Sequence, residues 1–383
     1  MTNKTTRAIA ADVVFDGENT HAEHAVVFSG ADIIDVKPRE DVVAVPTINL
    51  PPGMWLSPGF IDVQVNGGGD VLFNNVPTPE GIAAIVAAHR RFGTTALLPT
   101  LISDTAQTMR AARDAVSAAS ATMPEVLGIH FEGPFLSPER PGVHDKAVFR
   151  QPSEADVAVL KGRPGDLTLV TLAPECVPHG FIAHLCAAGL RVALGHSRAT
   201  YEETLVALAE GMTGFTHLFN AMRPLGSRDP GPIAAALEEP RAFYGLIVDG
   251  EHVAPATLRL ALRGAGQAML VTDAMPPVGG NDGPFMLAGQ QIGVSAGRCT
   301  TADGTLAGSV LDMASAVRNC VGLLRLNLAA ALRLATAAPA AFLGRSNRHG
   351  HLAPGCRADF VALDPHTITV RHVWVAGAET RVS

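Results

Sequence analysis

The sequence predicts an α/β protein built on a (β/α)8 TIM-type barrel, with a small β-sandwich domain formed by both chain termini. The first observation is a series of eight short, mostly apolar runs, which is typical of strands buried in a parallel sheet. The runs are FIDVQVN (60–66), TALLPTL (95–101), LGIHFEG (127–133), LTLVTLAPE (167–175), RVALGHS (191–197), GFTHLFN (214–220), YGLIVDG (244–250) and AMLVTDA (268–274).

The second observation is the composition of the segments between these runs. Most are rich in Ala, Leu and Val with charges on one face, such as residues 78–93 and 197–212, and therefore predict helices. Thr78 and Ser197 are the predicted N-caps of these two helices, since each precedes a glutamate near the first turn. Buried strands that alternate with helices indicate a parallel sheet covered on both faces, and eight such units indicate a closed barrel.

The third observation concerns the two ends of the chain. Both consist of short alternating or β-branched runs that are broken by Gly, Asp and Pro, which is typical of strands. Each end alone is too small for a stable sheet domain. We therefore expect residues 1–56 and 347–383 to form one discontinuous β-sandwich domain, and residues 57–346 to form the barrel.

Composition narrows the class of protein. The chain has 383 residues, of which 47% are hydrophobic, and a net charge of −7. It has no basic patch with interleaved aromatics, so we expect no nucleic-acid partner. No apolar run reaches the roughly 18 residues of a membrane span, and the N-terminus lacks the apolar core of a signal peptide. The five cysteines form no CxxC pair, which favours a reducing compartment. The expected location is the cytoplasm, without a membrane partner.

Polar residues cluster at the ends of the predicted strands. In a barrel enzyme the active site lies at the carboxyl ends of the strands, so these side chains should converge on one mouth. They are Gln64, Asn66, His130, Glu132, His196, His217, Asn220, Asp249, His252 and Asp273.

Three of these residues have the side chains of a metal site. Glu132, His196 and His217 supply one carboxylate and two imidazoles, and three protein ligands with an open fourth position describe a catalytic zinc-type site. Asp273 is then placed to move a proton between water and a leaving amine. Other interpretations stay open for each residue alone: a buried salt bridge for Glu132, core histidines for the imidazoles and a turn cap for Asp273. His130 shares a face with Glu132 and is a candidate neighbour of the site.

Gln64 and Asn66 stand one residue apart and so point the same way. In many metallohydrolases this position carries His-x-His, a clamp of two ligands. Here the clamp consists of two amides, which leaves three hypotheses: a metalloenzyme that has lost its metal, one that needs fewer metals, or no enzyme.

Several long motifs in order resemble the amidohydrolase superfamily, and more closely its family of N-acetylglucosamine-6-phosphate deacetylases. The resemblance covers essentially the whole chain. The motifs are PGFIDVQVNGGGD (58–70), HFEGPFLSPERPGVHD (130–145), LGHSRATYE (194–202), THLFNAM (216–222), RDPGPIAAAL (228–237), VDGEHV (248–253), VTDAM (271–275) and GTLAGSVLDM (304–313).

The resemblance implies hydrolysis of the acetamide of N-acetylglucosamine 6-phosphate, to glucosamine 6-phosphate and acetate. It implies one divalent metal per subunit, with zinc expected first and iron, cobalt or manganese as alternatives. The implied roles are metal binding by Glu132, His196 and His217, catalysis by Asp273 and His144, and substrate binding by Asn220, Ala221, His252 and Arg228. The resemblance also implies a homodimer, in which Arg228 reaches the neighbouring subunit's site.

The Gln-x-Asn form of the first strand marks a one-metal subtype in this family. Amides compete poorly with imidazole for a transition metal, so Gln64 and Asn66 are expected to form hydrogen bonds beside the metal. The alternative is that they only pack under the barrel mouth. Arg223 departs from the family pattern, and it either attracts the phosphate or faces solvent.

Three rival functions stay open. The nearest is deacetylation of the galacto epimer, N-acetylgalactosamine 6-phosphate, which differs in the orientation of one hydroxyl. The second is a different amidohydrolase, such as a cyclic-amide hydrolase, which would not need the phosphate loop. The third is a non-catalytic barrel that binds a sugar phosphate.

Overall fold

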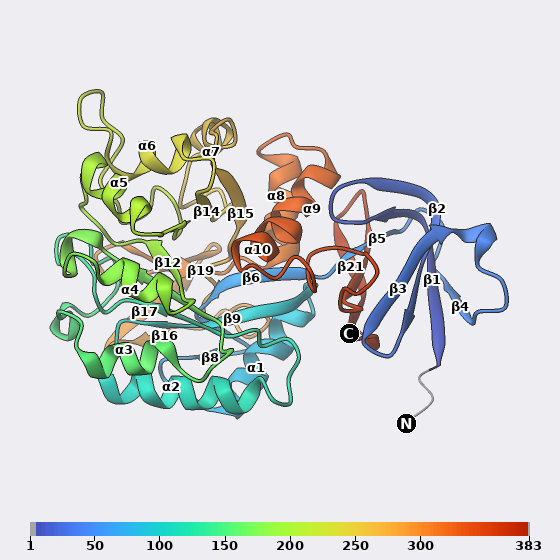
Figure 1. Cartoon of the computed structure of the whole chain (residues 1–383), viewed down its shortest axis with the longest axis horizontal. Coiled ribbons are helices and arrows are strands. Elements are labelled where there is room, and N and C mark those ends of the chain that lie inside the picture. The colour runs from blue at the N-terminus through green and yellow to red at the C-terminus, as the bar shows by residue number, and fades with distance from the viewer. Residues whose placement is uncertain (1–4, 382–383) are drawn as a thin grey trace. The chain divides into compact units, whose positions relative to one another are not determined.

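The computed structural model of the protein describes residues 5–381 (Figure 1). Its central sheet has eight parallel strands in the order β15-β14-β13-β12-β11-β10-β9-β6, which confirms the predicted barrel. The bounds are β6 (Phe60–Val65), β9 (Thr94–Ile102), β10 (Ile129–Glu132), β11 (Thr168–Leu172), β12 (Arg191–Leu194), β13 (Gly214–Phe215), β14 (Phe243–Leu246) and β15 (Gln267–Leu270).

The backbone beyond β15 nearly closes this sheet against β6. Asp273 N donates to Gln64 O at 3.0 Å, and Asn66 N donates to Ala274 O at 3.0 Å. The first and last strands of the barrel therefore bring Gln64, Asn66 and Asp273 together.

One α-helix lies in the chain between each pair of successive barrel strands. The helices are α1 (Pro79–Arg90), α2 (Ala106–Ala119), α3 (Glu154–Lys161), α4 (Phe181–Ala187), α5 (Tyr201–Ala209), α6 (Gly231–Glu238) and α7 (Pro255–Ala261). Of the two predicted caps, Thr78 is confirmed, since its Oγ1 accepts from Gly81 N at 3.2 Å. The prediction for Ser197 is wrong. Thr200 caps α5 in a reciprocal capping box with Glu203, which satisfies two donors at once.

Several barrel strands end earlier than the apolar runs suggest. β12 ends at Leu194 and β13 at Phe215, although the runs continue to residues 197 and 220. His196 has a φ of 48° and His217 a φ of 33°, and a backbone in the left-handed region cannot continue a strand. His196 and His217 therefore lie in the loops that follow their strands, whereas Gln64 lies within β6 and Glu132 is the last residue of β10.

A second sheet joins the two ends of the chain, as predicted (blue and red strands in Figure 1). Its order is β22-β21-β20-β5-β1-β2-β3, with β4 paired to β1. The bounds are β1 (Thr6–Phe15), β2 (Thr20–Ser29), β3 (Asp32–Pro38), β4 (Thr47–Asn49), β5 (Trp55–Pro58), β20 (Phe360–Asp364), β21 (Thr369–Val375) and β22 (Ala378–Arg381). The antiparallel pairing of β5 with β20 connects the N-terminal strands to the C-terminal ones.

The chain divides into two compact units. One comprises the residues up to Asp62, His89–Ala96 and the residues from Asp312 on, and it includes α8 (Met313–Gly322), α9 (Leu328–Ala335) and α10 (Ala337–Phe342). The other comprises Val63–Ala88 and Leu97–Leu311. The domain boundaries proposed from the sequence, after residues 56 and 346, stay a prediction.

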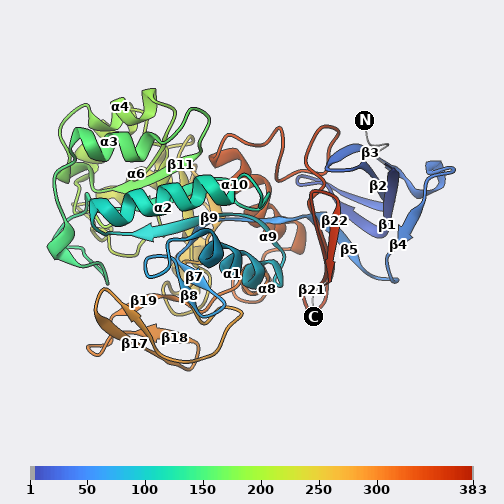
Figure 2. The same cartoon turned by 90° about the horizontal axis from the view of Figure 1, so that it is seen from below.

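A small antiparallel sheet follows β15 and was not predicted. Its strands are β16 (Phe285–Leu287), β17 (Gln290–Ser295), β18 (Arg298–Thr300) and β19 (Leu306–Ser309), and it lies near the β7 (Gly67–Gly68) and β8 (Val71–Leu72) pair (Figure 2). Leu287, Ile292 and Cys299 pack with Met275 and Leu72 in its core. Each strand of this sheet buries few side chains, so the sequence has no long apolar run that would predict the sheet.

Two further findings concern the cysteines and the expectation that the chain does not span a membrane. All five cysteines are free. No helix within residues 5–381 combines the length and apolarity that crossing a membrane requires.

Phe360 offers a test of the terminal sheet. Its side chain is fully buried, and its ring lies 5.3 Å from the ring of Phe28 and 6.3 Å from that of Trp374. Phe360→Ala should lower the free energy of unfolding by about 3–5 kcal/mol, because it leaves a cavity in this core. Urea unfolding measures the loss. Val43→Ala is the control, since Val43 is 77% exposed, and equal losses in the two variants would contradict the assignment.

Candidate active site

The predicted site residues converge at the carboxyl ends of the barrel strands. They line a pocket of about 370 Å³. The predicted residues that line it are Asn66, Glu132, His144, His196, His217, Asn220, Ala221, His252 and Asp273. Gln64 lies just beneath the pocket wall, and Arg228 is not part of the lining.

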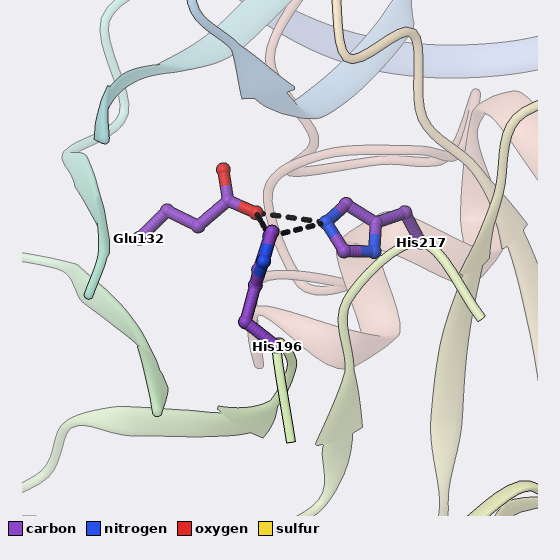
Figure 3. A group of neighbouring side chains, drawn as sticks. All are labelled: Glu132, His196 and His217. Carbon is purple, nitrogen blue, oxygen red and sulfur yellow. Dashed lines mark hydrogen bonds and ion pairs between the residues drawn. The ribbon is translucent and has the colours of Figure 1, made fainter. Parts of the chain in front are cut away.

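Glu132, His196 and His217 line the pocket and form a buried cluster, whose side chains point toward one another (Figure 3). Glu132 Oε1 lies 2.9 Å from His217 Nε2 and 3.2 Å from His196 Nε2, and the two Nε2 atoms are 3.1 Å apart. One potential ligand atom from each residue lies within 4.8 Å of the others, so the cluster could hold a metal ion. The donor set of one carboxylate and two imidazoles suits zinc and similar divalent metals.

Hydrogen bonds from the surrounding backbone orient this cluster. His196 Nδ1 donates to the carbonyl oxygen of Arg140 at 2.9 Å, which leaves the lone pair of a neutral ring on Nε2, facing Glu132 and His217. Burial favours the protonated form of Glu132, but the neighbouring His196 and His217 overcome this effect and hold the pKa of that carboxyl well below its usual value. Glu132 is therefore an anion, as a metal ligand must be.

Three polar residues of the site that closely follow a barrel strand have a left-handed backbone. The φ angles are 48° at His196, 33° at His217 and 51° at Asp273. This conformation costs free energy for residues other than glycine, and it persists only where surrounding contacts enforce it. Each side chain is turned into the pocket directly after its strand ends.

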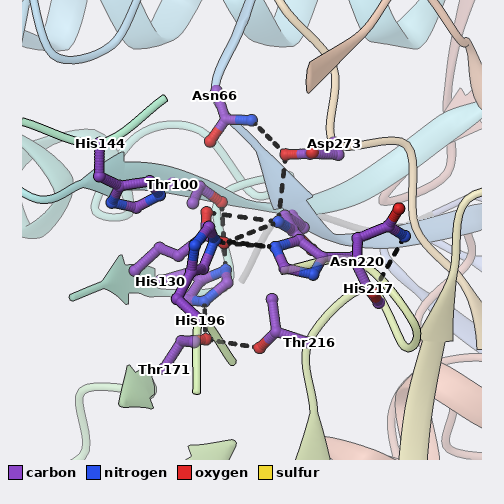
Figure 4. Close-up of polar contacts among 12 residues, drawn as sticks. Asn66, Thr100, His130, His144, Thr171, His196, Thr216, His217, Asn220 and Asp273 are labelled. Carbon is purple, nitrogen blue, oxygen red and sulfur yellow. Dashed lines mark hydrogen bonds and ion pairs between the residues drawn. The ribbon is translucent and has the colours of Figure 1, made fainter. Parts of the chain in front are cut away.

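Gln64 and Asn66 hold the carboxylate of Asp273. Asn66 Nδ2 donates to Asp273 Oδ1 at 2.6 Å, and Gln64 Nε2 donates to the same oxygen at 3.1 Å (Figure 4). Gln64 Nε2 also lies 3.3 Å from both carboxylate oxygens of Glu132. Burial, and next the charge of Glu132, raise the pKa of Asp273. The amides of Gln64 and Asn66 thus connect the Glu132–His196–His217 cluster to the carboxyl group of Asp273.

His144 enters the pocket from the loop after β10. Its Nδ1 accepts a hydrogen bond from Ser103 N at 3.3 Å and lies 2.8 Å from Ser103 Oγ. Because Nδ1 accepts a backbone hydrogen bond, the proton of the neutral ring is on Nε2. Burial, and then the neighbouring His196, hold the pKa of His144 well below its usual value, so the ring is a neutral donor. The sequence did not indicate Ser103, because a lone serine after a strand has no distinctive pattern.

The opposite wall carries the predicted sugar-phosphate residues. Asn220 Nδ2 donates to His217 O at 3.1 Å, so a hydrogen bond connects the Asn220–Ala221 loop to one residue of the Glu132–His196–His217 cluster. His252 Nδ1 lies 2.6 Å from Asp249 Oδ2, and Asp249 Oδ1 also accepts from His252 N at 2.9 Å. This pairing explains why Asp249 appeared among the polar strand ends: it orients His252.

The two arginines after Asn220–Ala221 behave differently. Arg223 Nε donates to Asp229 Oδ2 at 2.6 Å, and Arg223 Nη1 donates to Arg198 O at 3.3 Å. Its charge is therefore already compensated. Arg228 is exposed on the same loop and lies outside the pocket lining of its own chain.

His130 lies beneath the cluster rather than in the pocket. Its Nε2 lies 2.7 Å from Thr171 Oγ1 and its Nδ1 lies 3.0 Å from Val63 O, and Thr171 Oγ1 lies 2.6 Å from Thr216 Oγ1 (Figure 4). Burial lowers the pKa of His130 to about 4. The neutral ring thus connects β6, β10 and β11 inside the barrel.

A parallel barrel that gathers a buried glutamate and two histidines at the carboxyl ends of its strands is the architecture of metal-dependent hydrolases. The model of the Amidohydrolase family matches residues 55–380, and the chain belongs to this family.

Individual relatives narrow the comparison. The chain is 44% identical over 322 residues to an N-acetylgalactosamine-6-phosphate deacetylase of Shewanella sp. (strain ANA-3), which covers 83% of this chain and 81% of the relative. It is 38% identical over 342 residues to the N-acetylglucosamine-6-phosphate deacetylase of Mus musculus, covering 85% and 83% of the two chains.

Solved structures agree with these relatives. N-acetylglucosamine-6-phosphate deacetylase from Pasteurella multocida superimposes with a TM-score of 0.94 at 31% identity, covering 98% of this chain and all of the other. The enzyme of that name from Mycobacterium smegmatis superimposes with a TM-score of 0.90 at 35% identity, again covering 98% and 100%.

The buried position of His130 leads to a prediction about stability. His130→Leu should lower the free energy of unfolding by about 2–3 kcal/mol, because Val63 O and Thr171 Oγ1 lose a buried partner. Urea unfolding measures the loss, and metal analysis of the folded variant is the companion measurement. Loss of metal without loss of stability would instead place His130 in the metal site.

Proposed function

We propose that the protein hydrolyses the acetamide of N-acetylglucosamine 6-phosphate to glucosamine 6-phosphate and acetate. The observation that carries this proposal is a single pocket that joins the Glu132–His196–His217 cluster to Asp273 and His144. The names of the relatives supply the substrate class, a phosphorylated amino sugar.

Glu132, His196 and His217 would hold one divalent metal. Bound there, the metal supplies Lewis acidity, which lowers the pKa of a water to about 7 and polarises a carbonyl group. Zinc is the first expectation, and iron, cobalt and manganese suit the same donors.

Asp273 is the proposed acid and base. Its carboxylate takes the proton of the attacking water as the water oxygen bonds to the acetyl carbon. It then gives the proton to the sugar nitrogen, so that the C–N bond breaks and acetate and a free amine result. Because Gln64 and Asn66 both donate to Oδ1, Oδ2 stays available for this transfer.

His144 is the proposed oxyanion donor. Its Nε2 proton, defined by the hydrogen bond that Nδ1 accepts from Ser103 N, can donate to the acetyl oxygen. A donor aimed at an oxygen that gains negative charge stabilises the transition state more than the ground state.

Gln64 and Asn66 support a site with one metal. Their amide nitrogens are directed at the carboxylates of Glu132 and Asp273, and an amide nitrogen is no metal ligand. The two residues therefore take the place of a second metal's clamp and instead orient the acid and base.

Asn220, Ala221 and His252 are the proposed contacts for the sugar phosphate in the same chain. Arg228 is proposed to act in a second copy of the chain, since it is exposed and outside its own pocket. The proposed location of this dimer is the cytoplasm.

The galacto epimer is the second candidate substrate. It is favoured by one observation: the relative at 44% identity is named for N-acetylgalactosamine 6-phosphate. Acetate release from both epimeric phosphates and from unphosphorylated N-acetylglucosamine, compared as kcat/KM, tests the function. Equal rates with and without phosphate would favour another amidohydrolase, and no acetate release at all would favour a non-catalytic barrel.

Asp273→Asn tests the acid and base. We expect kcat to fall by about 10²- to 10⁴-fold, because the amide cannot accept or return the proton. Metal content should stay at the wild-type value, since Asp273 is not a member of the cluster. Wild-type turnover with intact metal would show that the role belongs to another residue.

Metal analysis tests the one-metal site. Purified protein should hold about one divalent metal per chain. Glu132→Gln should lose it on dialysis, because a neutral amide replaces the anionic ligand, whereas Gln64→Ala should retain it. Two tightly bound metals in the wild type, or metal loss from Gln64→Ala, would contradict the proposal.

A further inference from the structure

Arg140 is the only arginine among the described residues that lines the candidate active site. Its side chain is half-buried, and its Nε is buried without a hydrogen-bond partner in the chain. A buried donor that lacks a partner is destabilising, and more so when it is charged, so its usual explanation is a group absent from the protein alone. Arg140 lies within the family motif of residues 130–145, but the predicted site did not include it.

Backbone hydrogen bonds connect the Arg140 segment to the Asn220–Ala221 loop through residues 196 and 197. Arg140 O accepts from His196 Nδ1 at 2.9 Å, and Ser137 N donates to His196 O at 2.9 Å. On the far side of the same segment, Ser197 N donates to Ala221 O at 3.1 Å. The loops of residues 137–140, 196–197 and 221–223 therefore lie next to one another at the rim of the pocket.

The other charged groups on this rim are already paired. Arg198 forms an ion pair with Glu139, whose side chain also lines the pocket, so that carboxylate is compensated. Arg223 is paired with Asp229, and His252 with Asp249. Among the cations on this rim within residues 5–381, Arg140 is thus the one that forms no ion pair with a carboxylate.

We propose that the guanidinium group of Arg140 binds the phosphate of the sugar phosphate from within the same chain. This inference rests on the proposed function and extends its binding site. A guanidinium fork matches phosphate geometry and forms two parallel charge-assisted hydrogen bonds, which would satisfy the buried Nε. Arg140 therefore gives each chain its own cation for the phosphate, in addition to the one that Arg228 offers from a second copy.

Arg140→Gln and Arg140→Lys test the proposal by kinetics. For N-acetylglucosamine 6-phosphate, Arg140→Gln should raise KM by about 10- to 100-fold, as expected for loss of a charge-assisted hydrogen bond, with little change in kcat. Arg140→Lys keeps the charge and should recover part of this loss. For unphosphorylated N-acetylglucosamine, kcat/KM should stay unchanged in both variants.

Two controls separate phosphate binding from damage to the metal site. Metal content should stay at the wild-type value, because any residue at position 140 retains the carbonyl that accepts from His196. Arg110→Gln removes an exposed arginine from α2, outside this pocket, and should leave all constants unchanged. An equal loss on both substrates, or no loss on either, would overturn the phosphate contact.

Calorimetry with inorganic phosphate gives a readout that does not depend on turnover. Arg140→Gln should weaken phosphate binding by about tenfold or more, whereas Arg110→Gln should not. Together with the acetate assay, this measurement distinguishes failure of the proposed deacetylase function from failure of the proposed Arg140 contact. Wild-type protein that releases no acetate refutes the proposed function, and unchanged phosphate affinity in Arg140→Gln refutes the role of Arg140.

Discussion

The site depends on one buried anion. Glu132 is 2% exposed inside the barrel, and a carboxylate in that position is stable only if cations or donors surround it. His196, His217 and the amide of Gln64 supply these contacts from three other strands or their loops. A metal bound by the same groups would complete the compensation. The barrel can bring together residues that are far apart in the chain because all its strands are parallel and end at one mouth.

The amide pair of the first strand shows how a site can change without losing its architecture. Imidazoles at positions 64 and 66 would face the same space as ligands. The amides present there donate to Asp273 and Glu132 instead, and so they connect the proposed acid and base to the metal cluster. A donor at each carboxylate also favours the charged form, which opposes the effect of burial. The pair is therefore a set of hydrogen-bond donors that holds two buried carboxylates in place.

Left-handed backbone conformations and the small sheet after β15 shape the rest of the pocket. The left-handed conformations of His196, His217 and Asp273 turn these side chains inward directly after their strands. The small sheet β16–β19 contributes Thr305 and Leu306 to the pocket wall. Such loop features position functional groups on a rigid scaffold, which is where barrel enzymes vary.

Local patterns in the chain predict the eight buried strands, the terminal sheet and seven polar residues of the pocket lining, because continuous apolar runs and the polar residues that end them can be read from neighbouring positions. Contacts between distant parts of the chain set where the strands stop, that Thr200 rather than Ser197 caps α5, and that the amides hold Asp273. It alone placed Arg140 in the pocket and Arg228 outside it. These features depend on left-handed backbone angles and on contacts between distant loops, and neither leaves a periodic signal in the chain.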